Sequence, residues 1–218
     1  MIQRIGRKLR EKYSVIKEPA IYLRDKFADR DDEYILEREN IINGVGNAKC
    51  ADLGGGGNCT LTGMYNIMLY YRQLGYTRIP EDNEVLYGII KASAQELGFK
   101  NKGLTVTKNN DFVNRVWKKG FGYTSGKGRS RYLWRHSRLI KEIDEGRPFL
   151  FSLASGVYFN HTVAVCGYQV YRNIRTGKKY MFLIIANAWT NQRRYMAFTH
   201  TGAKYISCAT FVVPPFEK

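Results

Sequence analysis

The amino-acid sequence is poor in the residue types that bind metals. It contains three histidines and four cysteines, the latter at positions 50, 59, 166 and 208. No two cysteines form a Cys-x-x-Cys pair, and no histidine stands at zinc-ligand spacing from them. This pattern argues against a structural zinc site, and nothing in the sequence implies a metal or an organic cofactor. Four cysteines do not settle the redox compartment of a chain of 218 residues.

Long apolar runs are also missing. No stretch approaches the roughly 20 residues that a transmembrane helix needs. The N-terminus is basic, but no continuous apolar segment follows it, so it is not typical of a secretion signal. We therefore expect no transmembrane segment, and both a secreted and a cytoplasmic protein fit the sequence.

Acidic residues are scarce. The chain has 19 Asp and Glu against 35 Lys and Arg, a formal net charge of +16. Such an excess attracts anionic polymers, anionic membranes or acidic proteins. The basic residues are dispersed, with local clusters such as 127–131. Dispersed charge is more typical of a solvated surface than of base recognition, so nucleic acid is disfavoured as a partner, while an anionic polymer or an acidic protein stays open.

Hydrophobic residues make up 44% of the chain and aromatic residues 14%, enough for one sizeable core. We expect a folded domain at 45–218, preceded by an N-terminal arm at 1–44. Within the arm, the apolar spacing of residues 1–17 predicts an amphipathic helix with a basic outer face. The arm could pack on the domain or lie across a cleft, as a pro-segment does.

The apolar periodicity changes along the domain from helical to alternating. Helices followed by strands predict an α+β fold. The segments 41–57 and 120–128, which are rich in glycine, are expected to be loops. The expected helices are 59–75, 84–98, 111–119 and 139–145, and the expected strands are 149–153, 158–171, 179–186, 194–198 and 205–213.

The most informative stretch is GGGGNCTLTGMYNIMLYY, residues 54–71. Four glycines lead to Asn58, a favourable N-cap residue, and then to Cys59 at the first turn of an apolar helix. A helix N-terminus carries partial positive charge and unpaired N–H groups, which favour a thiolate over a thiol. Cys59 is therefore a candidate nucleophile, whereas Cys50, Cys166 and Cys208 are assigned to packing.

Two polar residues further along could serve such a thiolate. His161 opens the apolar stretch His161-Thr-Val-Ala-Val-Cys-Gly-Tyr168. Asn187 follows an apolar strand in the segment Asn187-Ala-Trp189. Cysteine, histidine and asparagine therefore occur in this order, the first on a helical half and the others on a β-rich half. Together they have the composition of a thiol catalytic triad.

These motifs, with Arg147-Pro148-Phe149 before a strand, resemble the papain-like cysteine peptidases. The closest likeness is to bacterial branches related to streptopain and to the double-glycine-type peptidases. The resemblance covers about residues 45–200. It implies a papain-like two-lobe fold, with a helical N-terminal lobe around a central buried helix and an antiparallel β-rich C-terminal lobe.

The resemblance also implies roles. Cys59 would be the nucleophile, His161 the general acid and base, and Asn187 the residue that orients the imidazole. Trp189 would shield the contact between His161 and Asn187 from water. The backbone N–H of Cys59 would be one oxyanion donor.

One feature departs from the family. Papain-type enzymes carry a glutamine before the nucleophile as the second oxyanion donor, but residues 52–57 contain none. Asn58 is the nearest side-chain amide, although an N-cap side chain points at its own helix. A glycine N–H of the loop is the other candidate.

The function expected from the sequence is therefore hydrolysis of peptide bonds in a protein or peptide substrate, through an acyl-enzyme on Cys59. An acyltransferase or deamidase would use the same triad, because all three share the thioester intermediate. A third hypothesis is a basic binding module on a catalytically weak peptidase scaffold. The net charge and the missing glutamine favour it, and the intact triad argues against it.

Overall fold

The computed structural model describes residues 15–27, 33–100, 103–154, 157–197 and 207–218. Residues 1–14, which carry most of the helix expected at 1–17, lie outside the described residues. Within the described residues, no helix is long and apolar enough to cross a membrane.

The fold is α+β, as expected from the sequence, and its centre is a seven-stranded sheet whose strand pairs are all antiparallel. The strand order is β2-β7-β3-β4-β5-β6, and β1 pairs with β4 beside this path. The strands are β1 (Tyr34–Ile41), β2 (Lys127–Arg131), β3 (Phe149–Leu153), β4 (His161–Asn173), β5 (Lys179–Ala186), β6 (Arg194–Ala197) and β7 (Ser207–Val213).

The long strand β4 organises the sheet. Its first half pairs with β3, whereas its second half pairs with β1 along the same edge. The ladder with β5 shifts register between Val165 and Gly167. A Cβ atom on Gly167 would stand 2.6 Å from the carbonyl oxygen of Asn40, so only glycine lets β1 approach at this point.

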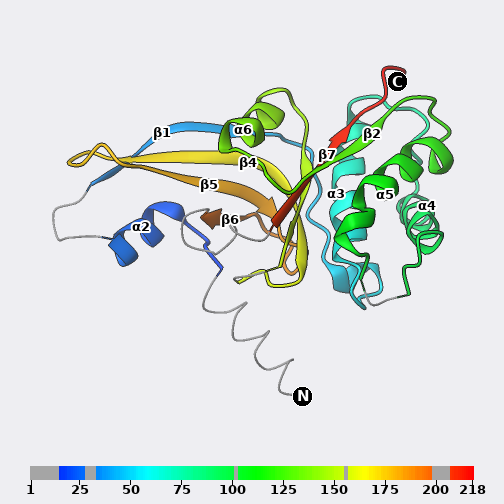
Figure 1. The fold of residues 1–218 in the computed structure, drawn as a ribbon, viewed down its shortest axis with the longest axis horizontal. Helices are drawn as coiled ribbons and strands as arrows, with labels where there is room; N and C mark the ends of the chain where they lie inside the picture. The colour runs from blue at the N-terminus through cyan, green and yellow to red at the C-terminus, as the bar shows by residue number, and fades with distance from the viewer. Residues whose placement is uncertain (1–14, 28–32, 101–102, 155–156, 198–206) are drawn as a thin grey trace, which may run out of the picture.

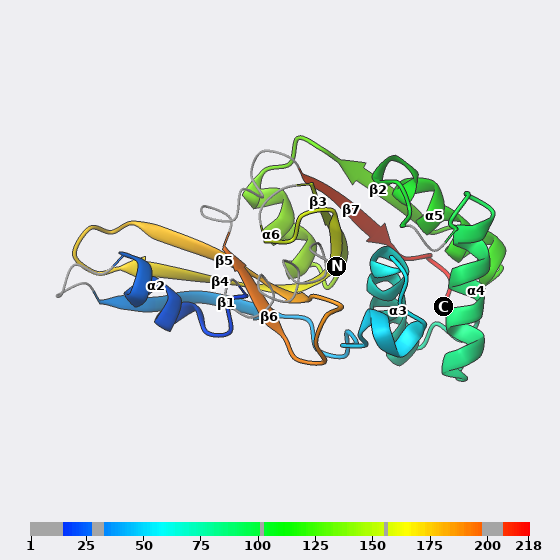
Figure 2. The same ribbon diagram turned by 90° about the horizontal axis from the view of Figure 1, so that it is seen from below.

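The helices gather mainly at one end of the molecule. In Figure 1, α3, α4 and α5 stand together at that end, while β1, β4 and β5 extend toward the other end, beside α2. Figure 2 gives the same arrangement from below. The helices are α2 (Pro19–Phe27), α3 (Cys59–Gln73), α4 (Asn83–Gln95), α5 (Asn109–Arg115), continued by a π-helical turn at Val116–Gly120, and α6 (His136–Asp144). Short 3₁₀ turns occupy Cys50–Leu53 and Val106–Lys108.

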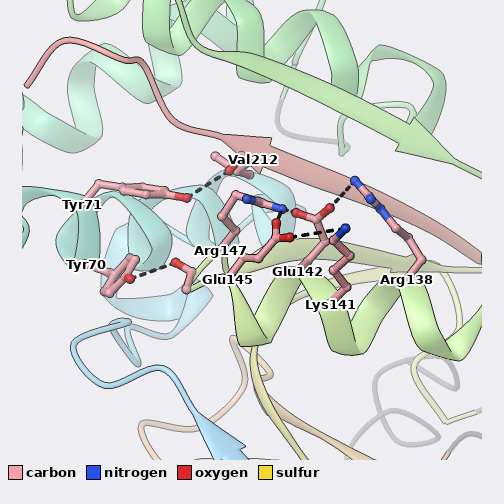
Figure 3. A network of polar contacts seen from close by, with 9 residues as sticks. Tyr70, Tyr71, Arg138, Lys141, Glu142, Glu145, Arg147 and Val212 are labelled. Atoms are coloured by element: carbon pink, nitrogen blue, oxygen red, sulfur yellow. Dashed lines mark hydrogen bonds and ion pairs between the residues drawn. The ribbon is translucent and has the colours of Figure 1, made fainter.

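Helix α3 is the buried centre of the helical group, and eleven of its fifteen residues are buried. It lies close to the sheet because Gly63 has no side chain: a Cβ atom there would stand 2.8 Å from Cδ2 of Leu150. Tyr70 and Tyr71 tie the other end of α3 to the carbonyl oxygens of Gly146 and Val212 (Figure 3). These contacts fix the helix against β3 and β7, and with it the position of Cys59.

Several expected elements are confirmed, and some are wrong. The strands at 149–153 and 179–186 have the expected bounds, and α3 begins at Cys59. Strand β4 begins at His161 instead of residue 158. Two strands were not expected at all: β1, inside the N-terminal arm, and β2, at the end of the expected loop. Because β1 pairs with β4, part of the arm belongs to the central sheet.

Candidate functional site

Cys59 is the first residue of α3 and follows a loop that glycine makes possible. Gly54, Gly55, Gly56 and Gly57 all have positive φ, at 88°, 64°, 70° and 77°. Side chains other than glycine rarely adopt this conformation, and a run of four excludes almost any other sequence. The glycine run therefore turns the chain sharply into the helix and brings the thiol to its N-terminus.

Asn58 occupies the N-cap position of α3, as the sequence predicts, but its side chain does not cap the helix. Its side chain is buried and makes no capping hydrogen bond to its own helix. Instead, Nδ2 donates to the carbonyl oxygens of Cys50 (3.3 Å) and Leu53 (2.9 Å) and to the Tyr87 hydroxyl (2.9 Å). The capping hydrogen bond is absent because these three contacts orient the amide toward the preceding loop and Tyr87. Since the amide hydrogens are used there, Asn58 is no oxyanion donor in this structure.

His161 is the first residue of β4, and its imidazole is buried. Asn160 before it has a φ of 52°, a left-handed conformation that asparagine tolerates better than most residues. Nε2 of His161 lies 2.7 Å from the backbone carbonyl oxygen of Asn187. A carbonyl oxygen only accepts, so Nε2 carries the hydrogen and Nδ1 is the nitrogen left for Cys59.

Asn187 contacts His161 as expected, through its backbone carbonyl oxygen. The sequence-based hypothesis assigns the contact with the imidazole to Asn187 without naming the atom. The side-chain oxygen instead accepts hydrogen bonds from the backbone N–H groups of Trp189 and Thr190, each at 3.1 Å. This closes an Asx turn around Ala188, whose φ is 58°. The turn aims the backbone carbonyl of Asn187 at the imidazole.

The two halves of the site are joined through Cys50. Its backbone N–H donates to the carbonyl oxygen of Ala188 at 2.8 Å, and its carbonyl oxygen accepts from Asn58. The turn that holds His161 is thus connected through two hydrogen bonds to the residue before Cys59. Sequence analysis assigned Cys50 to packing and missed this connection, which is made by the backbone and leaves no side-chain signal.

Aromatic rings cover the imidazole. The ring of Trp189 stacks on His161, with centroids 4.5 Å apart and an interplanar angle of 29°. Tyr158 stacks in turn on Trp189, at 5.0 Å and 26°. The position of Trp189 fits the shielding role expected for it. Tyr158 was not singled out from the sequence, where it was expected only as the first residue of a strand.

The surroundings set the Cys59 thiol apart from the other cysteines. Burial acts to raise the pKa of Cys59, but the hydrogen bond and the charge of His161, with backbone hydrogen bonds from Thr162 and Thr60, lower it to about 7. Burial raises the pKa of Cys166 to about 11 and that of Cys208 above its ordinary value. A substantial fraction of Cys59 is therefore a thiolate at neutral pH.

Cys59 and His161 open into a pocket of about 540 Å³. Gly57 lines it beside them, as do Tyr132 and Cys208. Its floor carries a chain of hydroxyls that sequence reasoning missed: Thr162 lies 3.1 Å from Thr60 and 2.9 Å from Ser152. The pocket can thus hold a ligand against the thiolate. In the described part of the chain, no cluster of three or more His, Cys, Asp or Glu residues could hold a metal ion.

Comparison with known proteins adds no assignment to this geometry. No family model matches the chain, and no curated protein sequence matches it. The function of the site is therefore argued from the contacts of Cys59, His161 and Asn187 themselves.

Proposed function

We propose that this protein is a cysteine peptidase of papain-like fold that hydrolyses peptide bonds through a thioester on Cys59. The observation that carries the proposal is the Cys59–His161 pair at the open pocket. Its thiol has a pKa of about 7 through the hydrogen bond to His161, and Nε2 of the imidazole is held 2.7 Å from the carbonyl of Asn187. A structural cysteine needs neither feature.

The first half-reaction uses both members of the pair. The Cys59 thiolate attacks the carbonyl carbon of the scissile bond, and a C–S bond forms while the carbonyl oxygen becomes an oxyanion. When the tetrahedral intermediate collapses, the C–N bond breaks and His161 gives its Nδ1 proton to the leaving amine. The carbonyl of Asn187 stabilises the imidazolium before this step, because it accepts the Nε2 hydrogen in either protonation state.

The second half-reaction restores the enzyme. Neutral His161 takes a proton from a water molecule at Nδ1, and the hydroxide attacks the thioester carbon. The C–S bond breaks, which releases the carboxylic acid and returns the thiolate–imidazolium pair. The backbone N–H of Cys59 is one donor for the oxyanion in both steps. Gly57 lines the pocket, so its N–H is the candidate for the second donor in place of Asn58.

The arrangement of the elements supports the papain-like part of the proposal. The nucleophile opens the buried helix α3, and α3 packs on β3 and β4 of the antiparallel sheet. The histidine stands at the start of β4, and the orienting residue follows β5. A helical group thus supplies the thiol and a β-rich part supplies the imidazole, as in a two-lobe thiol peptidase.

The test is cleavage of a peptide library, read by mass spectrometry, with Cys59→Ala and Cys166→Ala as a matched pair. We expect new termini with wild type and Cys166→Ala, and none with Cys59→Ala. Deamidated or cross-linked products that depend on Cys59 would instead identify an amidase or acyltransferase. Products that persist in Cys59→Ala would refute the assignment of the nucleophile.

A further inference from the structure

A second cavity, of about 580 Å³, lies between β2, β7 and α6 and is lined by basic side chains. We name it the basic groove. It presents five cationic residues: Arg129, Arg131, Arg135, Arg138 and Lys141. Arg129 and Arg131 alternate along β2 with Gly128 and Ser130, which face the other side of the strand, and both arginines are exposed.

Most of this charge is not neutralised locally. Arg138 pairs with Glu142 and Lys141 pairs with Glu145, but Arg147 shares both of these glutamates (Figure 3). In the described part of the chain, Arg129, Arg131 and Arg135 make no ion pair. Three guanidinium groups therefore face the groove without a counter-charge, and guanidinium groups are suited to bidentate contacts with carboxylates.

The basic groove adjoins the Cys59 pocket. Tyr132 lines the pocket, and the next residues, Leu133 and Trp134, line the groove. Nε1 of Trp134 also donates to Oγ of Ser207, at 3.0 Å, and Ser207 lines the pocket. By strand register, Ser152, Thr162 and Cys208 of the pocket lie on one face of the sheet, whereas Arg129, Arg131 and Phe211 of the groove lie on the other. An extended chain bound at Cys59 would reach the groove by passing around the end of the sheet at Tyr132.

From this continuity we infer that the basic groove binds an acidic segment of the polypeptide substrate, next to the bond that Cys59 attacks. The inference rests on the proposed peptidase function and specifies its substrate class. Exposed carboxylates would pair with Arg129, Arg131 and Arg135, and apolar side chains of the segment would cover Leu133, which is 97% exposed.

The aromatic residues of the groove favour a polypeptide over a single-stranded nucleic acid. Binding of single strands uses aromatic faces on which bases stack. Trp134 is occupied by an edge contact with Phe151 (5.4 Å between centroids) and by the ring of His136. Phe211 is buried, and the guanidinium of Arg138 lies over its ring at 5.3 Å. The exposed apolar residue is a leucine, which suits an apolar side chain better than a base.

The test measures how a peptide protects Cys59 from alkylation by iodoacetamide, since this readout needs no turnover. The probe is a glutamate-rich peptide of about 12 residues, which spans about 40 Å when extended. A glutamine-rich peptide of the same length is the neutral control. The groove variant combines Arg129→Gln, Arg131→Gln and Arg135→Gln. The matched variant combines Arg24→Gln, Lys100→Gln and Lys118→Gln, exposed residues that line neither cavity.

We expect the glutamate-rich peptide to slow alkylation equally in wild type and in the matched variant. The concentration needed for protection should rise about tenfold in the groove variant, since three exposed ion pairs of modest strength are lost. Added salt should weaken protection. The inference would be overturned if protection by the glutamate-rich peptide were weakened equally in the groove variant and in the matched variant. It would also be overturned if the glutamine-rich peptide protected Cys59 as well as the glutamate-rich peptide does. Stronger protection by oligothymidylate that depends on the same arginines would overturn it as well.

Failure of this inference is distinguishable from failure of the proposed function. The pH dependence of alkylation without peptide reports the thiolate of Cys59 alone. If the alkylation rate shows the pH dependence expected of a Cys59–His161 pair, but the glutamate-rich peptide gives no protection, only the acidic-substrate inference fails. If Cys59 titrates as an ordinary thiol while protection depends on the groove arginines, the peptidase proposal fails and an acidic-segment binding site remains.

Discussion

The imidazole of His161 is oriented by the backbone carbonyl of Asn187, 2.7 Å from Nε2, and not by the Asn187 side chain. The side chain instead holds the turn from which this carbonyl projects. The two functions of Asn187, orientation and turn closure, are thus carried by different atoms. A substitution of the side chain can therefore remove turn closure while it keeps the backbone carbonyl that accepts from His161.

The first prediction concerns Asn187→Ala. The carbonyl acceptor is kept, and the hydrogen bond from Cys50 N–H to the Ala188 carbonyl still holds the turn, so we expect the pKa of Cys59 to stay close to its wild-type value. The N–H groups of Trp189 and Thr190 lose their acceptor, which should lower the free energy of unfolding by about 2 kcal/mol. Urea unfolding and the pH dependence of alkylation measure the two effects separately. If the side chain were the orienting group, Asn187→Ala would raise the pKa of Cys59 with little change in stability.

The second prediction concerns the pH dependence of Cys59. Its pKa of about 7 means that the rate of alkylation should rise with pH around a midpoint near 7. In His161→Ala the hydrogen bond and the charge that lower the pKa are gone, and burial, which raises it, remains. The midpoint should therefore move above that of an ordinary thiol. A wild-type midpoint between 8 and 9, the usual range for a free cysteine, would contradict the thiolate–imidazolium pair.

The α+β class, the start of α3 and several strands could be predicted because they carry strong local patterns. The segment 149–153, FLFSL, is apolar except for Ser152 and is buried at every position. In contrast, β1 and β2 are mostly exposed strands, YILERENI and KGRSR, which have no alternation of apolar and polar residues. They form because β4 and β7 offer backbone partners far away in the sequence, and such partners leave no local signal.

The candidate site, like the fold, could be predicted only in part. Cys59, His161 and Asn187 could be singled out from residue type, order and neighbouring pattern. The atom of Asn187 that contacts His161 could not, since both oxygens are compatible with the sequence. The hydrogen bond between Cys50 and Ala188 was also out of reach, because backbone groups are the same in every residue. The N-cap position of Asn58 was predicted correctly, but the contacts of its side chain with the preceding loop were not.

The third prediction concerns the strained turn at Ala188. Its φ of 58° is costly for alanine and not for glycine. We expect Ala188→Gly to leave the free energy of unfolding unchanged or to raise it by up to about 1 kcal/mol. Ala186→Gly, two residues earlier on β5, is the matched control and should lower it by about 1 kcal/mol or more, since the strand conformation suits alanine. Urea unfolding of both variants measures the two changes in stability. A lower free energy of unfolding in both Ala188→Gly and Ala186→Gly would show that Ala188 is not strained.

The fourth prediction concerns Glu142, a buried carboxylate at the corner between α6 and β3 (Figure 3). Oε1 lies 2.5 Å from Arg138, and Oε2 lies 2.6 Å from Arg147. Neutralising it in Glu142→Gln leaves Arg147 with only Glu145 and Arg138 without a partner. The two arginines left behind are partly exposed, 41% for Arg138 and 24% for Arg147, so water can reach them. We therefore expect a loss of about 2 kcal/mol, the size typical of a hydrogen bond to a charged group.

Glu145→Gln is the matched control for Glu142→Gln. Glu145 also pairs with Arg147, but its side chain is 37% exposed, so water can replace the contact and the loss should stay below about 1 kcal/mol. The midpoints of urea unfolding measure both variants. Because Arg138 lines the basic groove, Glu142→Gln should also free this guanidinium and strengthen protection of Cys59 by the glutamate-rich peptide. Equal destabilisation by the two variants would mean that the burial of Glu142 does not set the strength of its ion pairs.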